Sequence, residues 1–196
     1  DYAQMLEQET LDGVVIVTPN NRHREMAIAA LDRNIAVLCE KPLAPTVEDC
    51  DAILEAERRS DAFLQVGLHM RYRTLNRHIK QTLDAGRLGP IRMAWCQEFR
   101  GDWRQGATPV PNARNELANW RYVQQASGGA IVEKLCHDFD LFAWWLNAKP
   151  VRVSGIGGNA FYTDRETIDH ADMIIEYDTG VKLNISLCMF SPNNRF

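Results

Sequence analysis

Three short apolar runs separated by helical patterns constrain the fold of this 196-residue chain more than any other feature. The runs cover residues 13–17, 35–39 and 62–67. The first two are continuous and apolar, and the first is rich in β-branched residues, which is typical of strands buried on both faces. Apolar residues at helical spacing lie between them, around residues 26–31 and 46–57. This order of strands and helices predicts a parallel sheet with right-handed crossovers, which is half of a doubly wound α/β domain.

The second half of the chain has a different pattern. We expect a strand at 91–99, a polar loop at 101–119, an apolar helix at 130–146 and further strands at 151–156, 171–177 and 181–188. The last two strands are joined by the tight turn Asp178-Thr179-Gly180. We therefore predict a partial α/β domain over residues 1–88, followed by a partial α+β domain with a mostly antiparallel open sheet over residues 89–196.

Composition excludes several classes of protein. The net charge is −4 and 45% of the residues are hydrophobic, as in an ordinary globular protein. The chain has no Lys/Arg block and no apolar run near the roughly 20 residues of a membrane span, so we expect neither a nucleic-acid nor a membrane partner. Its five cysteines show no metal-binding spacing and no signal peptide is visible, which favours reduced thiols, no metal site and a cytoplasmic location.

Polar motifs follow the first two strands of the predicted parallel sheet. Thr18-Pro19-Asn20-Asn21 comes after the first strand with His23 close behind, and Glu40-Lys41-Pro42 comes after the second. Ligands bind beyond the carboxyl ends of such strands. Each motif alone also fits a plain structural role, a turn in which Asn20 or Asn21 caps the next helix or a surface loop. Their occurrence at consecutive strand ends favours a binding site.

Lys41 is the candidate for chemistry in this group. A lysine beside a cleft loses hydration, which lowers its pKa and lets it donate to a substrate oxygen. Glu40 is placed to orient it, and Pro42 stiffens the loop.

A third candidate group lies in the predicted helix after Gly128-Gly129. Glu133 and His137 are four residues apart and so share one helix face, and Asp140 follows three residues later. A carboxylate beside a histidine sets its tautomer and raises its basicity, although a partly buried structural histidine explains the same pattern. Weaker features are Trp120-Arg121 at the end of the loop, and His69, Arg71 and Tyr72 after the third strand.

Taken in this order, the motifs resemble the glucose–fructose oxidoreductase/inositol dehydrogenase (Gfo/Idh/MocA) family of nicotinamide-dependent dehydrogenases. The residues that carry the resemblance are Asp12 to Asn20 with His23, Glu40-Lys41-Pro42, Trp120-Arg121, and Gly128-Gly129 with Glu133, Lys134 and His137. The resemblance covers essentially the whole chain. It implies a Rossmann domain followed by an α+β domain whose open sheet serves substrate binding and oligomerisation, with NAD or NADP as cofactor and a homodimer or homotetramer as assembly.

The resemblance also implies roles for individual residues. His137 would act as general acid/base on the substrate hydroxyl, Lys41 would hydrogen-bond the same oxygen, and Glu133 would take the place of the family's usual Asp. The residues implied near the cofactor are Thr18, Pro19, Asn20, His23, Glu40, Lys41, Trp120 and Arg121. The implied reaction is hydride transfer from a secondary alcohol of a sugar, inositol or related polyol.

Two departures from the family pattern leave alternatives open. Glu133 is followed by Lys134, so either side chain is a candidate to face the substrate. No G-x-G-x-x-G phosphate loop occurs, and the glycines at 155, 157 and 158 come too late to form one. We therefore expect the chain to be the second half of a Rossmann domain within a longer protein. A non-catalytic binding or regulatory protein on the same scaffold is the alternative, and a hydrolase or lyase using His137 and Lys41 is weaker because no nucleophile sits beside a base.

Overall fold

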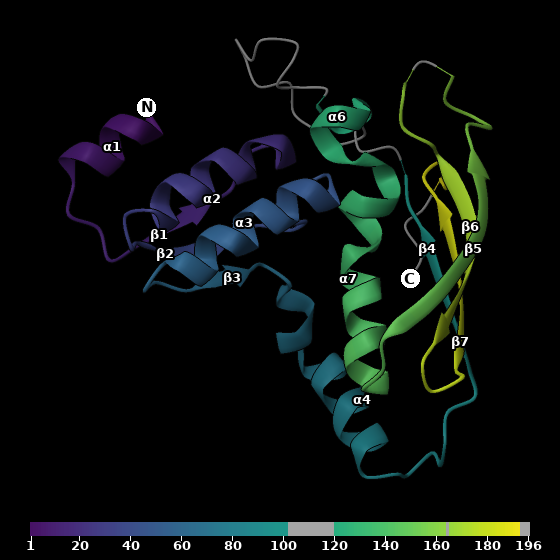
Figure 1. Ribbon diagram of the computed structural model, residues 1–196. Coiled ribbons are helices and arrows are strands. Elements are labelled where there is room, and N and C mark those ends of the chain that lie inside the picture. Colours follow the sequence, from purple (N-terminus) through teal and green to yellow (C-terminus); the bar gives the residue numbers. More distant parts are fainter. Residues whose placement is uncertain (102–119, 164, 193–196) are drawn as a thin grey trace. The chain divides into compact units, whose positions relative to one another are not determined.

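The computed structural model describes residues 1–101, 120–163 and 165–192, and Figure 1 shows the course of the chain. These residues form two compact units. The first holds Asp1–Leu68 together with residues 120–133, and the second holds residues 69–101, 134–163 and 165–192. The domain boundary that we predicted at residue 88 stays a prediction.

The first unit contains the predicted parallel sheet. Strands β1 (Gly13–Ile16), β2 (Ala36–Cys39) and β3 (Leu64–Val66) lie in that order, and both neighbouring pairs are parallel. The connections are η1 (Asn20–Arg22) with α2 (His23–Leu31), and α3 (Val47–Arg59); α1 (Tyr2–Gln8) precedes the sheet. The alternation that predicted a βαβαβ unit is therefore confirmed.

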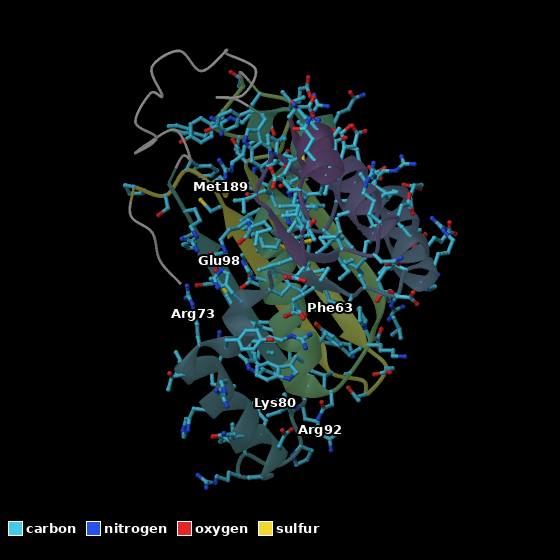
Figure 2. The ribbon with its side chains drawn as sticks, turned by 90° about the vertical axis from the view of Figure 1, so that its left-hand side faces the viewer. Phe63, Arg73, Lys80, Arg92, Glu98 and Met189 are labelled. Atoms are coloured by element: carbon cyan, nitrogen blue, oxygen red, sulfur yellow. The ribbon has the colours of Figure 1, made fainter. Side chains whose placement is uncertain are left out.

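Burial on both faces of these strands was a wrong expectation for the described residues. Val15, Val17 and Leu38 are 66%, 70% and 42% exposed, whereas Ile16, Val37 and Cys39 are buried. Phe63, labelled in Figure 2, is 66% exposed just before β3. The reason is topological: two right-handed crossovers that advance in the same direction along a sheet place both helices on one face. Helices α2 and α3 lie side by side there (Figure 1).

The helix ends show which local signals were sufficient. The Thr46 hydroxyl accepts a hydrogen bond from the Asp49 backbone N–H at 3.1 Å and so forms the N-cap of α3. The expectation that Asn20 or Asn21 caps α2 is wrong, because Arg22 occupies that position and makes no side-chain cap bond. The turn η1 separates the asparagines from the helix start.

The second unit packs helices against a four-stranded mixed sheet. Strands β4 (Met93–Phe99), β5 (Pro150–Gly158), β6 (His170–Tyr177) and β7 (Lys182–Cys188) lie in the order β4-β7-β6-β5. The pair β4–β7 is parallel and the other two pairs are antiparallel, so the predicted mostly antiparallel sheet is confirmed. The helical elements of this unit are η2 (His69–Tyr72), α4 (Thr74–Asp84) and most of α7 (Gly129–Leu146).

Three details qualify the sequence expectations. Helices α1 and α4 were not predicted. The glycines at 155, 157 and 158 lie in strand β5, as their rejection as a phosphate loop requires, and a Cβ on Gly155 would come within 2.7 Å of the Met173 side chain. Most of the predicted loop 101–119 lies outside the described residues. Within the described part of the chain, no helix is both long and apolar enough to cross a membrane.

Candidate functional site

A pocket of about 330 Å³ lies in the first unit at the carboxyl ends of β1 and β2. Seven of the eight residues predicted near a cofactor line it, and so does Glu133, which was predicted to be catalytic. The full lining is Val17, Thr18, Pro19, Asn20, Glu40, Lys41, Trp120, Arg121 and Glu133. The structure therefore brings together segments that are up to 116 residues apart in the sequence, at the edge of the sheet where ligands of open α/β sheets bind.

A buried carboxylate shared by two cations forms one wall of this pocket. Lys41 Nζ donates to the backbone carbonyl of Glu133 at 2.9 Å and lies 3.4 Å from its Oε1. Arg121 Nε donates to the same Oε1 at 3.3 Å. The Glu133 side chain is only 8% exposed, so both contacts are poorly screened by water. This arrangement fixes the Lys41 ammonium and leaves one of its three N–H donors for a ligand oxygen.

Neighbouring groups hold the two cations in place. The Arg121 guanidinium lies 4.6 Å from the centre of the Trp120 ring, a cation–π arrangement. The Glu40 carboxylate accepts a hydrogen bond from the Lys41 backbone N–H at 3.0 Å. Gly67 provides the room for Glu40, since a Cβ there would come within 3.3 Å of the Glu40 backbone and carboxyl carbon. Gly67 was not singled out from the sequence, because nothing local to β3 indicates this close approach.

Glu133 and Lys134 have different partners in the structure. Glu133 contacts Lys41 and Arg121 in the pocket, whereas the Lys134 ammonium lies 3.3 Å from Glu98 Oε2 and 3.9 Å from Asp138 Oδ2. Lys134 thus pairs with a residue of strand β4 and with a residue of the next turn of α7. The helix directs successive side chains about 100° apart, which separates the two residues.

His23 lies behind the pocket rather than in its wall. It is completely buried, and its ring nitrogens lie 3.0 Å from the carbonyl oxygens of Pro42 and Thr18. The ring thus ties together the loops that follow β1 and β2. His23 was predicted to lie near the cofactor, and in this geometry it supports the loops that line the pocket.

Asn20 links the pocket to the start of α7. Its side chain is 2% exposed and donates to the carbonyl oxygen of Ser127 at 2.9 Å. Ser127 ends the short helix α6 (Gln124–Ser127), which follows η3 (Trp120–Tyr122), and its hydroxyl accepts from the Gly129 backbone N–H at 2.9 Å. Sequence analysis missed Ser127, whose role depends on a partner 107 residues away.

Gly128 and Gly129 are required by the backbone at this turn. Their φ angles are +81° and +84°, the left-handed region that favours glycine. Gly128 also lies close to its surroundings: a Cβ there would come within 3.1 Å of the Pro45 carbonyl oxygen. The Gly-Gly pair therefore sets where α7 begins, and with it the position of Glu133.

His137 belongs to the second unit, four residues after Glu133 along α7. Its side chain is 5% exposed, and its ring meets the ring of His69 edge-on with centroids 4.8 Å apart. Asp140, one turn further, accepts two hydrogen bonds from Arg71 at 2.7 and 2.5 Å. His69 and Arg71, which were weak features of the sequence, are thus neighbours of the predicted catalytic helix.

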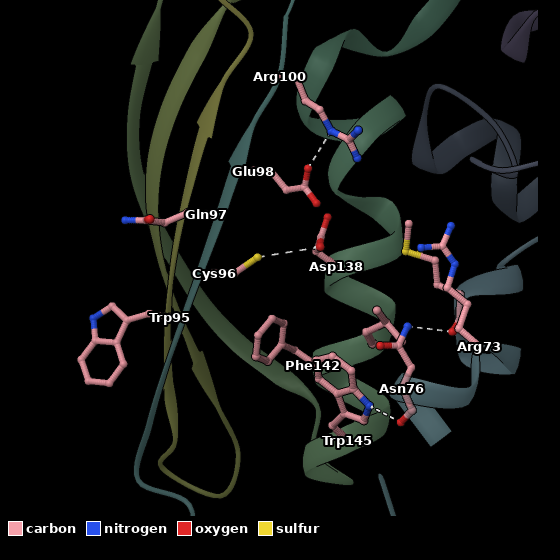
Figure 3. A pocket seen from close by; sticks show the side chains of 12 residues that line it. Arg73, Asn76, Trp95, Cys96, Gln97, Glu98, Arg100, Asp138, Phe142 and Trp145 are labelled. Atoms are coloured by element: carbon pink, nitrogen blue, oxygen red, sulfur yellow. Dashed lines mark hydrogen bonds and ion pairs between the residues drawn. The ribbon is translucent and has the colours of Figure 1, made fainter. Parts of the chain in front are cut away.

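The second unit holds a separate pocket of about 590 Å³, shown in Figure 3, that was not predicted. Phe142 and Trp145 of α7 line it, and Cys96 and Glu98 of β4 face Asp138 of the same helix. Burial, partly opposed by Lys134, raises the pKa of Asp138 to about 6, and burial raises the pKa of Cys96 to about 12. Cys96 therefore stays a thiol at neutral pH, and this interior is a structural network rather than a nucleophilic site.

Cys39 and Cys50 agree with that description. Burial also raises the pKa of Cys39 to about 12 and raises that of Cys50. Across residues 1–101, 120–163 and 165–192, no three His, Cys, Asp or Glu side chains are grouped so that they could hold a metal ion.

Comparisons with known proteins match the chain in two parts. A family model described as "Oxidoreductase family, NAD-binding Rossmann fold" matches residues 1–68, and one described as "GFO/IDH/MocA C-terminal domain" matches residues 76–196. Scyllo-inositol 2-dehydrogenase (NAD(+)) of Bacillus subtilis strain 168 is 30% identical over 98% of this chain and 53% of its own length. Inositol 2-dehydrogenase of Salmonella typhimurium strain LT2 is 31% identical over 78% of this chain and 41% of its own.

A solved structure confirms the fold. The WlbA dehydrogenase from Bordetella pertussis in complex with NADH and UDP-GlcNAcA has a TM-score of 0.86 at 23% identity, covering 100% of this chain and 54% of its own. At that identity the likeness is one of fold. The chain spans about half the length of the curated relatives it matches.

Proposed function

Because this chain belongs to the GFO/IDH/MocA family of oxidoreductases, we propose that the protein is an NAD-dependent dehydrogenase acting on a secondary alcohol of an inositol, sugar or related polyol. The observation that carries the proposal is the pocket at the ends of β1 and β2, where Lys41, Arg121 and the buried Glu133 meet. The inositol dehydrogenases among the relatives support the substrate class.

The residues of the pocket suit a nicotinamide nucleoside. Its donors are the Lys41 ammonium, the Arg121 guanidinium and the Thr18 hydroxyl, which match the hydroxyl and amide oxygens of such a ligand. The indole of Trp120 and the ring of Pro19 add apolar surface. When bound, the nicotinamide supplies a carbon that accepts hydride. The relative named for NAD(+) favours NAD over NADP.

The chain's own residues bind, orient and move the proton. We propose that Lys41 hydrogen-bonds the substrate hydroxyl and that His137 takes its proton, since a neutral imidazole suits transfer in both directions at neutral pH. Glu133 acts on Lys41 by holding its ammonium through the 3.4 Å ion pair. Thr18, Pro19, Asn20, Glu40, Trp120 and Arg121 remain the proposed cofactor-binding residues, with His23 supporting their loops.

We also propose a cytoplasmic homo-oligomer assembled through the sheet of the second unit. Free cysteines with raised pKa values suit a reducing compartment. The sheet carries exposed apolar side chains that include Trp95, Ile156 and Ile174, and exposed apolar patches often mark interfaces.

The test is a cofactor and substrate panel with the full-length protein. We expect NAD⁺ to be reduced, followed by absorbance at 340 nm, with one of the inositols or with a sugar, and NADP⁺ to be reduced more slowly. Cofactor binding by NADH fluorescence without turnover of any polyol would favour the non-catalytic alternative. Unchanged NADH and NADPH fluorescence at millimolar cofactor would overturn the proposal.

A further inference from the structure

The turn η2 contacts helix α7 at two positions that follow His137. The Arg71 guanidinium makes a two-point contact with Asp140, three residues after His137, through Nε–Oδ2 at 2.7 Å and Nη2–Oδ1 at 2.5 Å. The same guanidinium lies 5.6 Å from the ring centre of Trp144, one turn further along the helix. A two-point Arg–carboxylate contact fixes direction as well as distance.

A second set of bonds holds the same turn from the side of α4. The Asn76 amide donates to the carbonyl oxygen of Met70 at 2.8 Å, and the Trp145 indole donates to the carbonyl oxygen of Asn76 at 3.0 Å. Figure 3 shows Asn76 and Trp145 facing each other across this contact. The turn has only four residues, His69 to Tyr72, and two of them are thereby fixed to α7 directly or through Asn76.

His69 is the member of this turn that meets the His137 ring. Its ring lies 4.8 Å from that of His137 at an interplanar angle of 68°, an edge-on contact. The terminal torsion of a histidine is broad, so backbone and rotamer alone leave the direction of the ring nitrogens loosely defined. A ring packed edge-on against it narrows that range, and the direction of a ring nitrogen decides whether a proton can be transferred.

We propose that His69 is a positioning residue for His137, held in place by the clamp between Arg71 and Asp140. The inference rests on the proposed role of His137 as general acid/base. His69 acts through the ring of His137, so its effect appears in turnover and not in cofactor binding.

The test compares His69→Ala, His69→Phe and the matched control His78→Ala in the full-length protein. His78 is an exposed histidine of α4. We expect His69→Ala to lower kcat by roughly 10-fold, with KM for NAD⁺ unchanged, because loss of orientation slows chemistry without weakening binding. His69→Phe keeps an aromatic edge and should restore most of kcat, whereas His78→Ala should behave as the wild type. His69→Gln, polar and not aromatic, replaces His69→Ala if that variant does not fold.

A second readout is independent of activity. The His137 ring C–H signals, identified in ¹³C–¹H spectra by their loss in His137→Gln, should move in His69→Ala and return toward their wild-type position in His69→Phe. If the protein has no dehydrogenase activity but these signals still move in His69→Ala, the proposed function is refuted while the contact between the two rings is supported. Unchanged His137 signals, or a kcat in His69→Ala equal to that of the wild type in an active enzyme, would overturn the positioning role.

Discussion

Lys41 is held at two points by one residue, the carbonyl oxygen and the carboxylate of Glu133. The Glu133 side chain is buried and the Lys41 side chain is 19% exposed, so the charge lies at the pocket wall with few alternative positions. In the proposed mechanism, replacing Lys41 by Ala removes the donor to the substrate oxygen, and replacing His137 by Ala removes the proton acceptor. We expect each change to lower kcat by roughly 10²–10⁴ while the fold is kept, as measured by NADH production in the full-length protein.

The control for this prediction is Arg24→Gln. Arg24 forms an exposed ion pair with Asp49 at 3.0 Å on the helical face of the first unit and should be dispensable for activity. Circular dichroism checks that all three variants are folded. Near-wild-type turnover in Lys41→Ala or His137→Ala would refute the assigned roles.

Asp169 shows a second buried charge, in the second unit. Burial by itself raises the pKa of this carboxyl, but donation from the backbone N–H groups of Tyr162, Ala160 and Phe161 and from the His170 ring outweighs it and lowers the pKa to about 2. A lowered pKa stabilises the fold above the unfolded value near 4, and this stability is lost as the pH falls through about 2. We expect Asp169→Asn to cost roughly 2 kcal/mol at pH 7 and much less near pH 2, measured by urea unfolding.

The neighbour Asp172 supplies the control for Asp169. It is exposed on strand β6, which begins directly after Asp169, and it accepts one hydrogen bond from Ser186, so Asp172→Asn should change the unfolding free energy little at either pH. If Asp169→Asn lowers the free energy of unfolding equally at pH 7 and near pH 2, the contribution of Asp169 comes from packing and not from its charge.

At the level of single residues, most residues that line the pocket could be predicted from the sequence, whereas the residues that hold them in place could not. Thr18, Glu40 and Lys41 were found because polar residues at the ends of parallel strands meet at one edge. Ser127, Gly67 and the partners of His23 were missed because their roles depend on close contacts between distant segments. Such contacts leave no periodic signal in the chain.

The turn between α6 and α7 is the element that places Glu133. Gly128 and Gly129 share a positive φ, but their surroundings differ: a Cβ on Gly128 meets the backbone oxygen of Pro45, whereas one on Gly129 meets the flexible end of Gln124. We expect Gly129→Ala to cost about 1–2 kcal/mol for the left-handed backbone. Gly128→Ala should cost about 1–3 kcal/mol more, because the backbone around Pro45 must shift.

Thermal unfolding and NADH production together test the role of this turn. Gly128→Ala should lower both the unfolding midpoint and kcat, since the start of α7 moves with it, while Gly129→Ala lowers chiefly the midpoint. If Gly128→Ala and Gly129→Ala lower the unfolding midpoint equally, the close approach of Gly128 to Pro45 does not contribute to the loss of stability.

Elements with strong periodicity were predicted, and elements defined by their neighbours were not. The three parallel strands and the hairpin of β6 and β7 follow from continuous apolar runs and from Asp178-Thr179-Gly180. Continuous runs also predicted burial on both faces, which is wrong for the described residues because α2 and α3 lie on one face. The apolar residues of a strand show that both of its faces can be buried. The topology of the chain decides whether a helix covers each face.

On the scale of the whole molecule, the chain does not divide at one point of the sequence. Residues 120–133 return to the first unit after the chain has entered the second, and they bring Trp120, Arg121 and Glu133 to the ends of β1 and β2. Local patterns cannot show such a return, because a short polar segment carries no information about its distant partner. It was anticipated only through the resemblance to a known family, which places the same motifs in the same order.

The sheet of the second unit offers the last prediction. Pairing with Asn184 puts Trp95 and Ile174 on one face, where they are 67% and 50% exposed. If this face joins copies of the protein, Trp95→Glu and Ile174→Glu place charges in an apolar interface and should reduce the mass found by sedimentation velocity of the full-length protein to that of a monomer. Leu75→Glu, at a residue that is 68% exposed on α4, should leave the assembly intact. A wild-type monomer, or variants with the wild-type mass, would exclude this face as the interface.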